Sequence, residues 1–159
     1  MRKTVVAALL LAALPAAAAL AMDDHMAIQA NALKWGPAPP GLPPGAQVAV
    51  VTGDPSKDGP YVVRAKLPAG YRIMPHTHPT DENVTVLSGT FHIAMGGKFD
   101  AKKGEAVKTG GFFNAEKDMQ HYGWTTVPTV VQVHGMGPFA ITYVNPADDP
   151  RNAKASVKK

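Results

Sequence analysis

The sequence predicts an all-β domain, and three observations support this fold class. Short apolar runs alternate with turn signals along most of the chain, which is typical of a β-sandwich or β-barrel. Glycine and proline each occur 15 times in 159 residues, a combined share of about 19 % that exceeds the ~12 % of average proteins and favours a turn-rich fold. Hydrophobic residues make up 45 % of the chain, enough for a core, and the length suits a single domain.

Residues 1–21 have the composition of a secretory signal peptide. Two basic residues near the start precede an apolar run at 5–14, and Ala-Leu-Ala at 19–21 fits the small-x-small cleavage rule. A permanent membrane anchor is the alternative, but Pro15 leaves the apolar run short of the ~20 residues that a spanning helix needs. We therefore predict a periplasmic protein with no membrane association after the signal is removed.

The rest of the chain is predicted to form one domain with two flanking segments. Residues 22–45 are an N-terminal arm, and their Pro/Gly-rich part at 36–45 cannot form a regular helix. A β-domain follows at 46–144, and residues 145–159 are expected to leave it as a C-terminal tail. The expected strands are 46–52, 61–67, 71–76, 83–88, 90–95, 105–108, 111–114, 120–125, 129–134 and 139–144.

Turn residues and side-chain alternation justify these strands. The turn signals between them include Gly53-Asp54-Pro55, Asp58-Gly59-Pro60, Pro68-Ala69-Gly70, Ser88-Gly89 and Gly96-Gly97. Within 61–67 the odd-numbered residues from Tyr61 to Leu67 are apolar and share one face, while Arg64 and Lys66 share the other. This strand is therefore expected to be half buried, with its charged residues in solvent.

The charge distribution argues against nucleic-acid binding. The formal net charge is +4, but two basic residues belong to the predicted signal and four to the last nine residues. Residues 22–150 hold 10 basic and 12 acidic side chains, a net charge of −2. A nucleic-acid-binding domain needs a basic stripe, so we predict no nucleic-acid partner.

The stretch 70–89 carries the residues that point to chemistry. His76 and His78 are two apart, so on a strand both imidazoles face the same side. A bend at 79–80 lets Glu82 point toward them. Two imidazoles and a carboxylate suit a divalent transition metal such as Fe, Mn, Zn, Ni, Co or Cu. Further histidines lie in the β region at His92, His121 and His134, and the absence of cysteine excludes thiolate ligands.

This stretch resembles the first cupin motif, Gly-x5-His-x-His-x3-Glu-x6-Gly, at every fixed position. The matching residues are Gly70, His76, His78, Glu82 and Gly89. The second motif, Gly-x5-Pro-x-Gly-x2-His-x3-Asn, is matched in part, by Gly110 and His121. The substituted positions of the second motif are Glu116, Asp118 and Thr125.

The resemblance to cupins implies a fold and a set of metal ligands. The implied fold is a single-domain cupin β-barrel or jelly roll with one divalent transition metal inside. The implied ligands are His76, His78, Glu82 and His121. If His121 points inward, Tyr122 and Trp124 point outward, into a second hydrophobic layer or a subunit interface.

Two functions fit this expectation. The first is a periplasmic, metal-dependent enzyme that acts on a small molecule, of dioxygenase-like, isomerase or lyase type. The second is a non-catalytic periplasmic protein that binds a metal or a small ligand. Cupins commonly pair through their sheets, so the resemblance also implies a homodimer. The sequence singles out no catalytic residue beyond the implied ligands.

Overall fold

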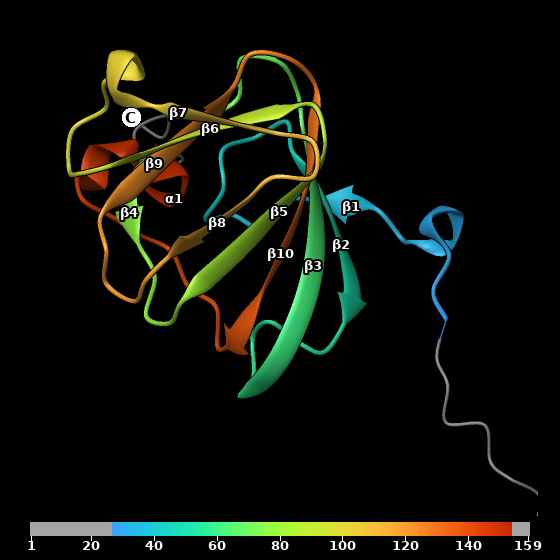
Figure 1. The fold of residues 1–159 in the computed structure, drawn as a ribbon. Helices are drawn as coiled ribbons and strands as arrows, with labels where there is room; N and C mark the ends of the chain where they lie inside the picture. Colours follow the sequence, from blue (N-terminus) through green and yellow to red (C-terminus); the bar gives the residue numbers. More distant parts are fainter. Residues whose placement is uncertain (1–26, 154–159) are drawn as a thin grey trace, which may run out of the picture.

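The computed structural model describes residues 27–153, so the predicted signal peptide lies outside the described residues. Two antiparallel sheets face each other (Figure 1), which confirms the predicted all-β fold. The first sheet has the order β1 (Gly36–Pro37), β2 (Gln47–Thr52), β3 (Gly59–Leu67), β10 (Thr129–Gly137), β5 (Glu82–Ser88) and β8 (Phe112–Ala115). The second has the order β11 (Thr142–Tyr143), β4 (Arg72–Thr77), β9 (His121–Thr125), β6 (Thr90–Met95) and β7 (Glu105–Lys108).

The expected strands match the observed ones closely, with differences near the chain ends. A short strand, β1, forms inside the arm and pairs with β2. The expected strand 139–144 is reduced to β11, because residues 139–141 leave the sheet. The Phe139 amide instead donates to the Pro55 carbonyl at 2.7 Å. The chain at this point therefore contacts the loop between β2 and β3 and does not extend the second sheet.

Two hydrophobic clusters hold the described fold together. The larger cluster lies between the sheets and includes Val84, Val86 and Val131 from the first sheet and Phe91 and Ile93 from the second. A smaller cluster of Ala94, Tyr122 and Trp124 packs with Phe99. Tyr122 is fully buried there, and its hydroxyl donates to the Asp100 carbonyl at 3.1 Å. The predicted second hydrophobic layer around Tyr122 and Trp124 is therefore present.

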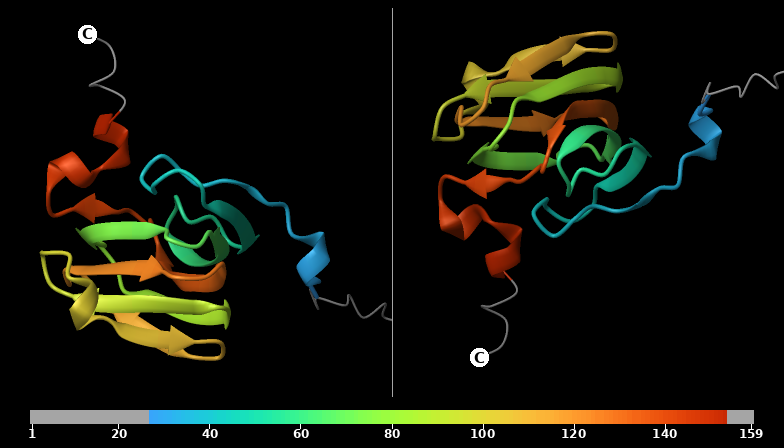
Figure 2. Two further views of the ribbon diagram at one scale, coloured as in Figure 1. Left: turned by 90° about the horizontal axis from the view of Figure 1, so that it is seen from above. Right: turned by 90° about the horizontal axis from the view of Figure 1, so that it is seen from below.

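The described helices are short and lie near the chain ends or in loops. They are η1 (Ala30–Ala32), η2 (Ala101–Lys103), η3 (Pro146–Asp148) and α1 (Pro150–Ala153). None of them has the length and apolar character of a membrane span. The segment with η1 projects away from the barrel, whereas η3 and α1 lie beside it (Figures 1 and 2).

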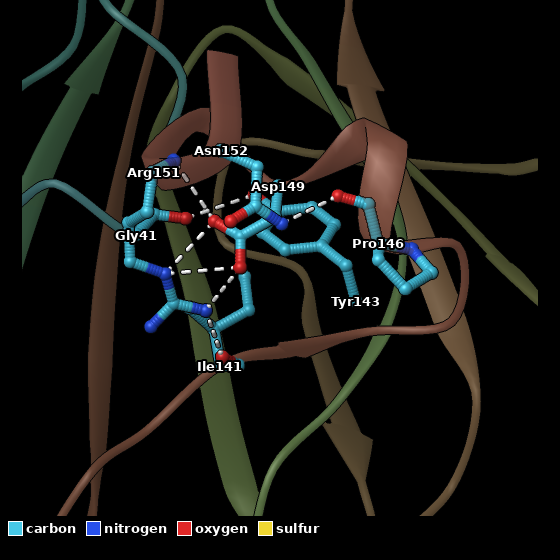
Figure 3. Close-up of polar contacts among 7 residues, drawn as sticks. All are labelled: Gly41, Ile141, Tyr143, Pro146, Asp149, Arg151 and Asn152. Atoms are coloured by element: carbon cyan, nitrogen blue, oxygen red, sulfur yellow. Dashed lines mark hydrogen bonds and ion pairs between the residues drawn. The ribbon is translucent and has the colours of Figure 1, made fainter. Parts of the chain in front are cut away.

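The arm near Gly41 and the C-terminal segment from Ile141 to Arg151 meet at one side of the barrel. Tyr143 of β11 donates its hydroxyl to the Gly41 carbonyl of the arm at 2.9 Å. Arg151 of α1 donates to the Ile141 carbonyl at 3.0 Å and pairs with Asp149 at 2.7 Å (Figure 3). The first contact fastens the arm at Gly41 to β11, and the Arg151 contacts fasten α1 to the residues just before β11 and just before α1. The predicted boundaries at 45/46 and 144/145 stay predictions.

Thr125, which stands where the second cupin motif has asparagine, is an internal hydrogen-bonding residue. It is buried at the end of β9, donates to the Pro68 carbonyl at 2.6 Å and accepts from the Tyr71 amide at 3.2 Å. Replacing Thr125 with valine should lower the free energy of unfolding by about 1–3 kcal/mol, because it removes two hydrogen bonds made by a buried hydroxyl. Urea denaturation measures this loss, and Thr142→Val at an exposed strand position is the matched control. Equal stability of the two variants would contradict this role.

Candidate metal centre

Three histidines from neighbouring segments of the second sheet converge inside the barrel. His76 lies on β4 directly opposite His121 on β9, and His78 follows β4 by one residue. The exposed fraction is 4 % for His76 and 2 % for both His78 and His121. Their ring centroids are 4.2 Å apart for His76 and His121, and 4.8 Å apart for His76 and His78. The predicted parity of His76 and His78 is therefore confirmed.

Each imidazole is oriented by a backbone carbonyl. Nδ1 lies 2.7 Å from the Met74 carbonyl in His76 and 2.9 Å from the Met119 carbonyl in His121. In His78 it lies 2.7 Å from the Ala140 carbonyl. A carbonyl only accepts hydrogen bonds, so each Nδ1 carries a proton, and Nε2 is the nitrogen that has the free lone pair in the neutral ring. Histidines that bind metals are oriented in this way.

Glu82 brings a carboxylate to the same point from the first sheet. It is the first residue of β5 and follows the bend at 79–80, as the sequence predicted. Its Oε2 lies 3.5 Å from Nε2 of both His78 and His121. Neither Nε2 makes a hydrogen bond with any described residue. The carboxylate and the two nitrogens thus border one small polar space at the junction of the sheets.

The ionisation of His76 and Glu82 favours cation binding. Burial, followed by the neighbouring rings of His121 and His78, lowers the pKa of His76 to about 3, so its imidazole is neutral at pH 7. Burial alone would raise the pKa of Glu82, but the adjacent His121 and His78 outweigh it and lower that pKa. Burial also opposes charge on His78, yet Glu82 raises the pKa of that imidazole. Neutral imidazole and ionised carboxylate are the states that bind metals.

The turn before His121 departs from the cupin motif in sequence but keeps a compact geometry. Asp118, which stands where the motif has glycine, has φ of 61°, a conformation that aspartate adopts more readily than most residues. Its amide donates to the His78 carbonyl at 2.9 Å, and the Met119 amide donates to Glu116 at 3.0 Å. The turn therefore links the segment of His78 to that of His121.

The four side chains fit one transition-metal ion. One ligand atom each from His76, His78 and His121 lie within 4.8 Å of one another. Two nitrogens bound at about 2.1 Å to the same ion lie at most about 4.2 Å apart, so the cluster is close to the required size. The unpartnered Nε2 atoms of His78 and His121 supply the lone pairs. A metal there would also remove the cost of leaving these buried atoms unpaired.

The cluster lies on the wall of an apolar cavity of about 130 Å³. Both sheets contribute, through residues such as Val63, Val131 and Ile73. The remaining wall comes from outside the sheets and consists of Pro39, Leu42, Pro55, Phe139 and Ile141. Phe139 stacks on the His78 ring at a centroid distance of 4.6 Å. A molecule in this cavity would therefore contact the candidate ligands and otherwise mainly hydrocarbon.

The other two histidines of the β region stand apart from this site. His92 stacks on Trp124, with ring centroids 5.0 Å apart, in the outer hydrophobic layer. On β10 Val131 and Val133 face the cavity, so alternation places His134 on the opposite face. The structure thus brings together the four residues that the sequence selected, while their action as ligands stays a prediction.

Sequence reasoning missed the residues that close the cavity. The composition of the Pro/Gly-rich arm excluded a regular helix but gave no sign that Pro39 and Leu42 line the site. Tyr61 was predicted only as a core residue, yet its buried hydroxyl has no hydrogen-bond partner among the described residues. The apolar alternation of 61–67 could place Tyr61 on the inner face. The alternation could not show which groups surround the hydroxyl of Tyr61.

Similar folds occur among solved structures. A candidate acetylacetone dioxygenase from Methylibium petroleiphilum is 17 % identical, with a TM-score of 0.61 over 85 % of this chain and 95 % of that one. The polyketide cyclase RemF from Streptomyces resistomycificus is 16 % identical, with a TM-score of 0.63 over 82 % and 93 %. An RmlC-like cupin from Shewanella frigidimarina is 11 % identical, with a TM-score of 0.54 over 69 % and 87 %. At these sequence identities the similarity shows a shared fold and no more.

A family comparison agrees with the fold and with the motif. Curated protein sequences give no significant match to this chain. The family model of the ChrR cupin-like domain, however, matches residues 23–140. That match includes both motif regions, the three-histidine cluster and most of the two sheets. The chain therefore belongs to the ChrR cupin-like domain family of the cupin superfamily.

Proposed function

We propose that this protein is a metal-dependent enzyme that acts on a small molecule, with dioxygenase-like chemistry as the favoured reaction class. One observation carries the proposal: three imidazoles and a carboxylate meet at the wall of an apolar cavity. A binding site for the metal alone would not need an adjoining cavity of about 130 Å³. Sites that hold a metal and admit a second molecule beside it are suited to catalysis.

The residues have separate tasks in this proposal. His76, His78, His121 and Glu82 would hold one divalent transition metal. When bound, a redox metal supplies oxygen activation, whereas Zn, Ni or Mn supplies Lewis-acid chemistry. The backbone carbonyls of Met74, Ala140 and Met119 keep the three rings in orientation. The apolar walls exclude water from the reacting molecule, which strengthens electrostatic interactions at the site.

The structural neighbours support small-molecule chemistry on this fold. One is a candidate acetylacetone dioxygenase and another is a polyketide cyclase. Both names concern molecules that carry carbonyl oxygens. We extend this chemistry to the present chain as a proposal, because its cavity is small and apolar.

The cellular setting is also proposed. The composition of residues 1–21 supports export to the periplasm. The net charge of −2 over residues 22–150 supports the proposal that there is no nucleic-acid partner. We also propose a homodimer. The exposed apolar side chains of Phe112 on β8 and Leu87 on the adjacent strand β5 support this proposal.

Oxygen uptake tests the reaction class. We expect the mature protein, loaded with Fe²⁺ under anaerobic conditions, to consume oxygen when mixed with a reactive member of a panel of small ketones, diketones and phenols. A dioxygenase places both oxygen atoms in the product, so uptake should equal substrate consumed without an added reductant. His76→Ala treated identically should show no uptake.

A second outcome would favour the alternative function. If the wild-type protein retains metal and binds a panel member, yet converts none in its Fe, Mn, Zn or Ni form, the enzyme proposal is wrong. The protein would then be a non-catalytic binding protein. Mass spectrometry of the reaction mixtures separates these results, because it detects products of redox and non-redox reactions alike.

A further inference from the structure

Tyr61 is a polar side chain of the cavity wall that lies outside the candidate ligand set. It lies on β3, is 1 % exposed and lines the cavity. Its hydroxyl has no hydrogen-bond partner among the described residues. A buried hydroxyl that leaves water without gaining a partner costs free energy. An acceptor brought by a bound molecule would remove that cost.

The Tyr61 ring is held beside the candidate metal centre. Its edge meets Phe139 at a centroid distance of 5.8 Å, and Phe139 stacks on His78 at 4.6 Å. Gly135 lies opposite Tyr61 on β10, and a Cβ there would lie 3.4 Å from the Tyr61 hydroxyl. The glycine thus leaves room for the hydroxyl. Burial and then the Glu82 charge raise the pKa of Tyr61, so the hydroxyl keeps its proton for donation.

The charges of the other lining residues indicate which charge a bound molecule can carry. Among the described residues that line the cavity there is no lysine or arginine. Tyr61 is the sole residue of that lining with a polar side chain apart from the three histidines and Glu82. An anion in the apolar part of the cavity would therefore have no cationic side chain to neutralise it, and only a bound metal ion could do so. This lining favours an uncharged molecule.

The volume limits the size of that molecule. The cavity measures about 130 Å³. An apolar cavity of about 150 Å³ accommodates benzene. The cavity thus suits a compact molecule of about the size of benzene.

We propose that the cavity binds a small, uncharged, largely apolar molecule carrying a carbonyl or hydroxyl oxygen, and that Tyr61 donates a hydrogen bond to that oxygen. This inference rests on the proposed function, because it assigns the substrate class of the same site. The candidate ligands would hold the metal beside the molecule. Tyr61 would select oxygen-bearing molecules over plain hydrocarbons of equal size.

Two matched probes and two matched variants test this inference. Pentane-2,4-dione is uncharged at neutral pH, and 3-oxobutanoate has the same number of non-hydrogen atoms with a carboxylate in place of one methyl ketone. Both are titrated calorimetrically into the Zn²⁺-loaded protein, in which no redox turnover occurs. The variants are Tyr61→Phe and Tyr71→Phe. Tyr71 is also a buried tyrosine, but its hydroxyl donates to the Pro43 carbonyl at 2.6 Å and it does not line the cavity.

We expect the dione to bind at least about tenfold more tightly than 3-oxobutanoate. Tyr61→Phe should weaken dione binding about tenfold, with an unchanged zinc content. The free energy of unfolding of ligand-free Tyr61→Phe should equal or exceed that of the wild type, because the variant removes an unpaired hydroxyl. Tyr71→Phe should show the opposite pattern, with unchanged binding and lower stability.

Three results would overturn the inference while leaving the proposed function intact. They are equal dione affinity in Tyr61→Phe and wild type, tighter binding of 3-oxobutanoate, and binding of neither probe by protein that holds zinc. Failure of the wild-type protein to bind any metal would instead overturn the proposed function. Zinc content, measured on each sample, distinguishes the two failures.

Discussion

Replacing His121 with alanine should abolish retention of the metal. His121 contributes one of three buried imidazoles and lies opposite His76, with its Nε2 3.5 Å from the Glu82 carboxylate. Loss of this ligand should lower metal affinity by more than about 100-fold, because loss of a partner that merely orients a ligand already costs 10–100-fold. Elemental analysis of purified wild-type and variant protein measures the effect, and His76→Ala should behave in the same way.

The control is a histidine that shares the sheet but not the cluster. His92→Ala removes an imidazole stacked on Trp124 and should leave the metal content unchanged. Circular dichroism establishes that each variant keeps its β-sheet signature. Wild-type protein without a first-row transition metal, or His121→Ala with a full complement, would refute the assignment of the site.

Replacing Gly89 with alanine should cause the largest loss of stability among the glycine positions of the two motifs. Gly89 connects β5 to β6 and has φ of 82°, which costs an L-residue about 1–2 kcal/mol. An added Cβ would also lie 2.5 Å from the Pro128 carbonyl oxygen and 2.7 Å from the Thr129 hydroxyl. Relief of this overlap requires backbone movement, which costs a further ~1–3 kcal/mol. We therefore expect a total loss of about 2–5 kcal/mol.

Gly110 separates the two contributions. Its φ of 83° nearly equals that of Gly89, but a Cβ there meets no atom within 4 Å. Gly110→Ala should therefore lose only the backbone contribution of about 1–2 kcal/mol. Urea unfolding of the two variants measures the difference. Equal losses would show that the close approach of residues 128 and 129 has no energetic effect.

The sequence predicted those structural features that depend on residues close together in the chain. Alternation and turn residues are properties of short segments, so the positions of most strands could be predicted. The shared face of His76 and His78 follows from strand geometry alone. Thr125 and Asp118, where the motif has other residues, still provide a buried hydrogen bond and a left-handed backbone position.

Features that depend on distant segments could not be predicted from local patterns. The pairing of His76 with His121 depends on the register of β4 and β9. His121 was selected through the resemblance to the second motif. The contribution of Pro39 and Leu42 to the cavity depends on the path of the arm across the barrel. The unpaired hydroxyl of Tyr61 depends on what surrounds it in three dimensions.

The contacts of the C-terminal segment link access to the cavity with the orientation of one candidate ligand. The four candidate ligands lie on or next to the strands β4, β5 and β9, whereas Leu42 and Ile141 belong to irregular segments fastened by the Tyr143 hydroxyl and by Arg151. Such segments open by local unfolding at a lower free energy than the strands of a core. The residence time of a ligand is then set by this fastening. Opening of residues 139–141 would also release the Ala140 carbonyl from Nδ1 of His78, so ligand exchange and metal retention are linked through His78.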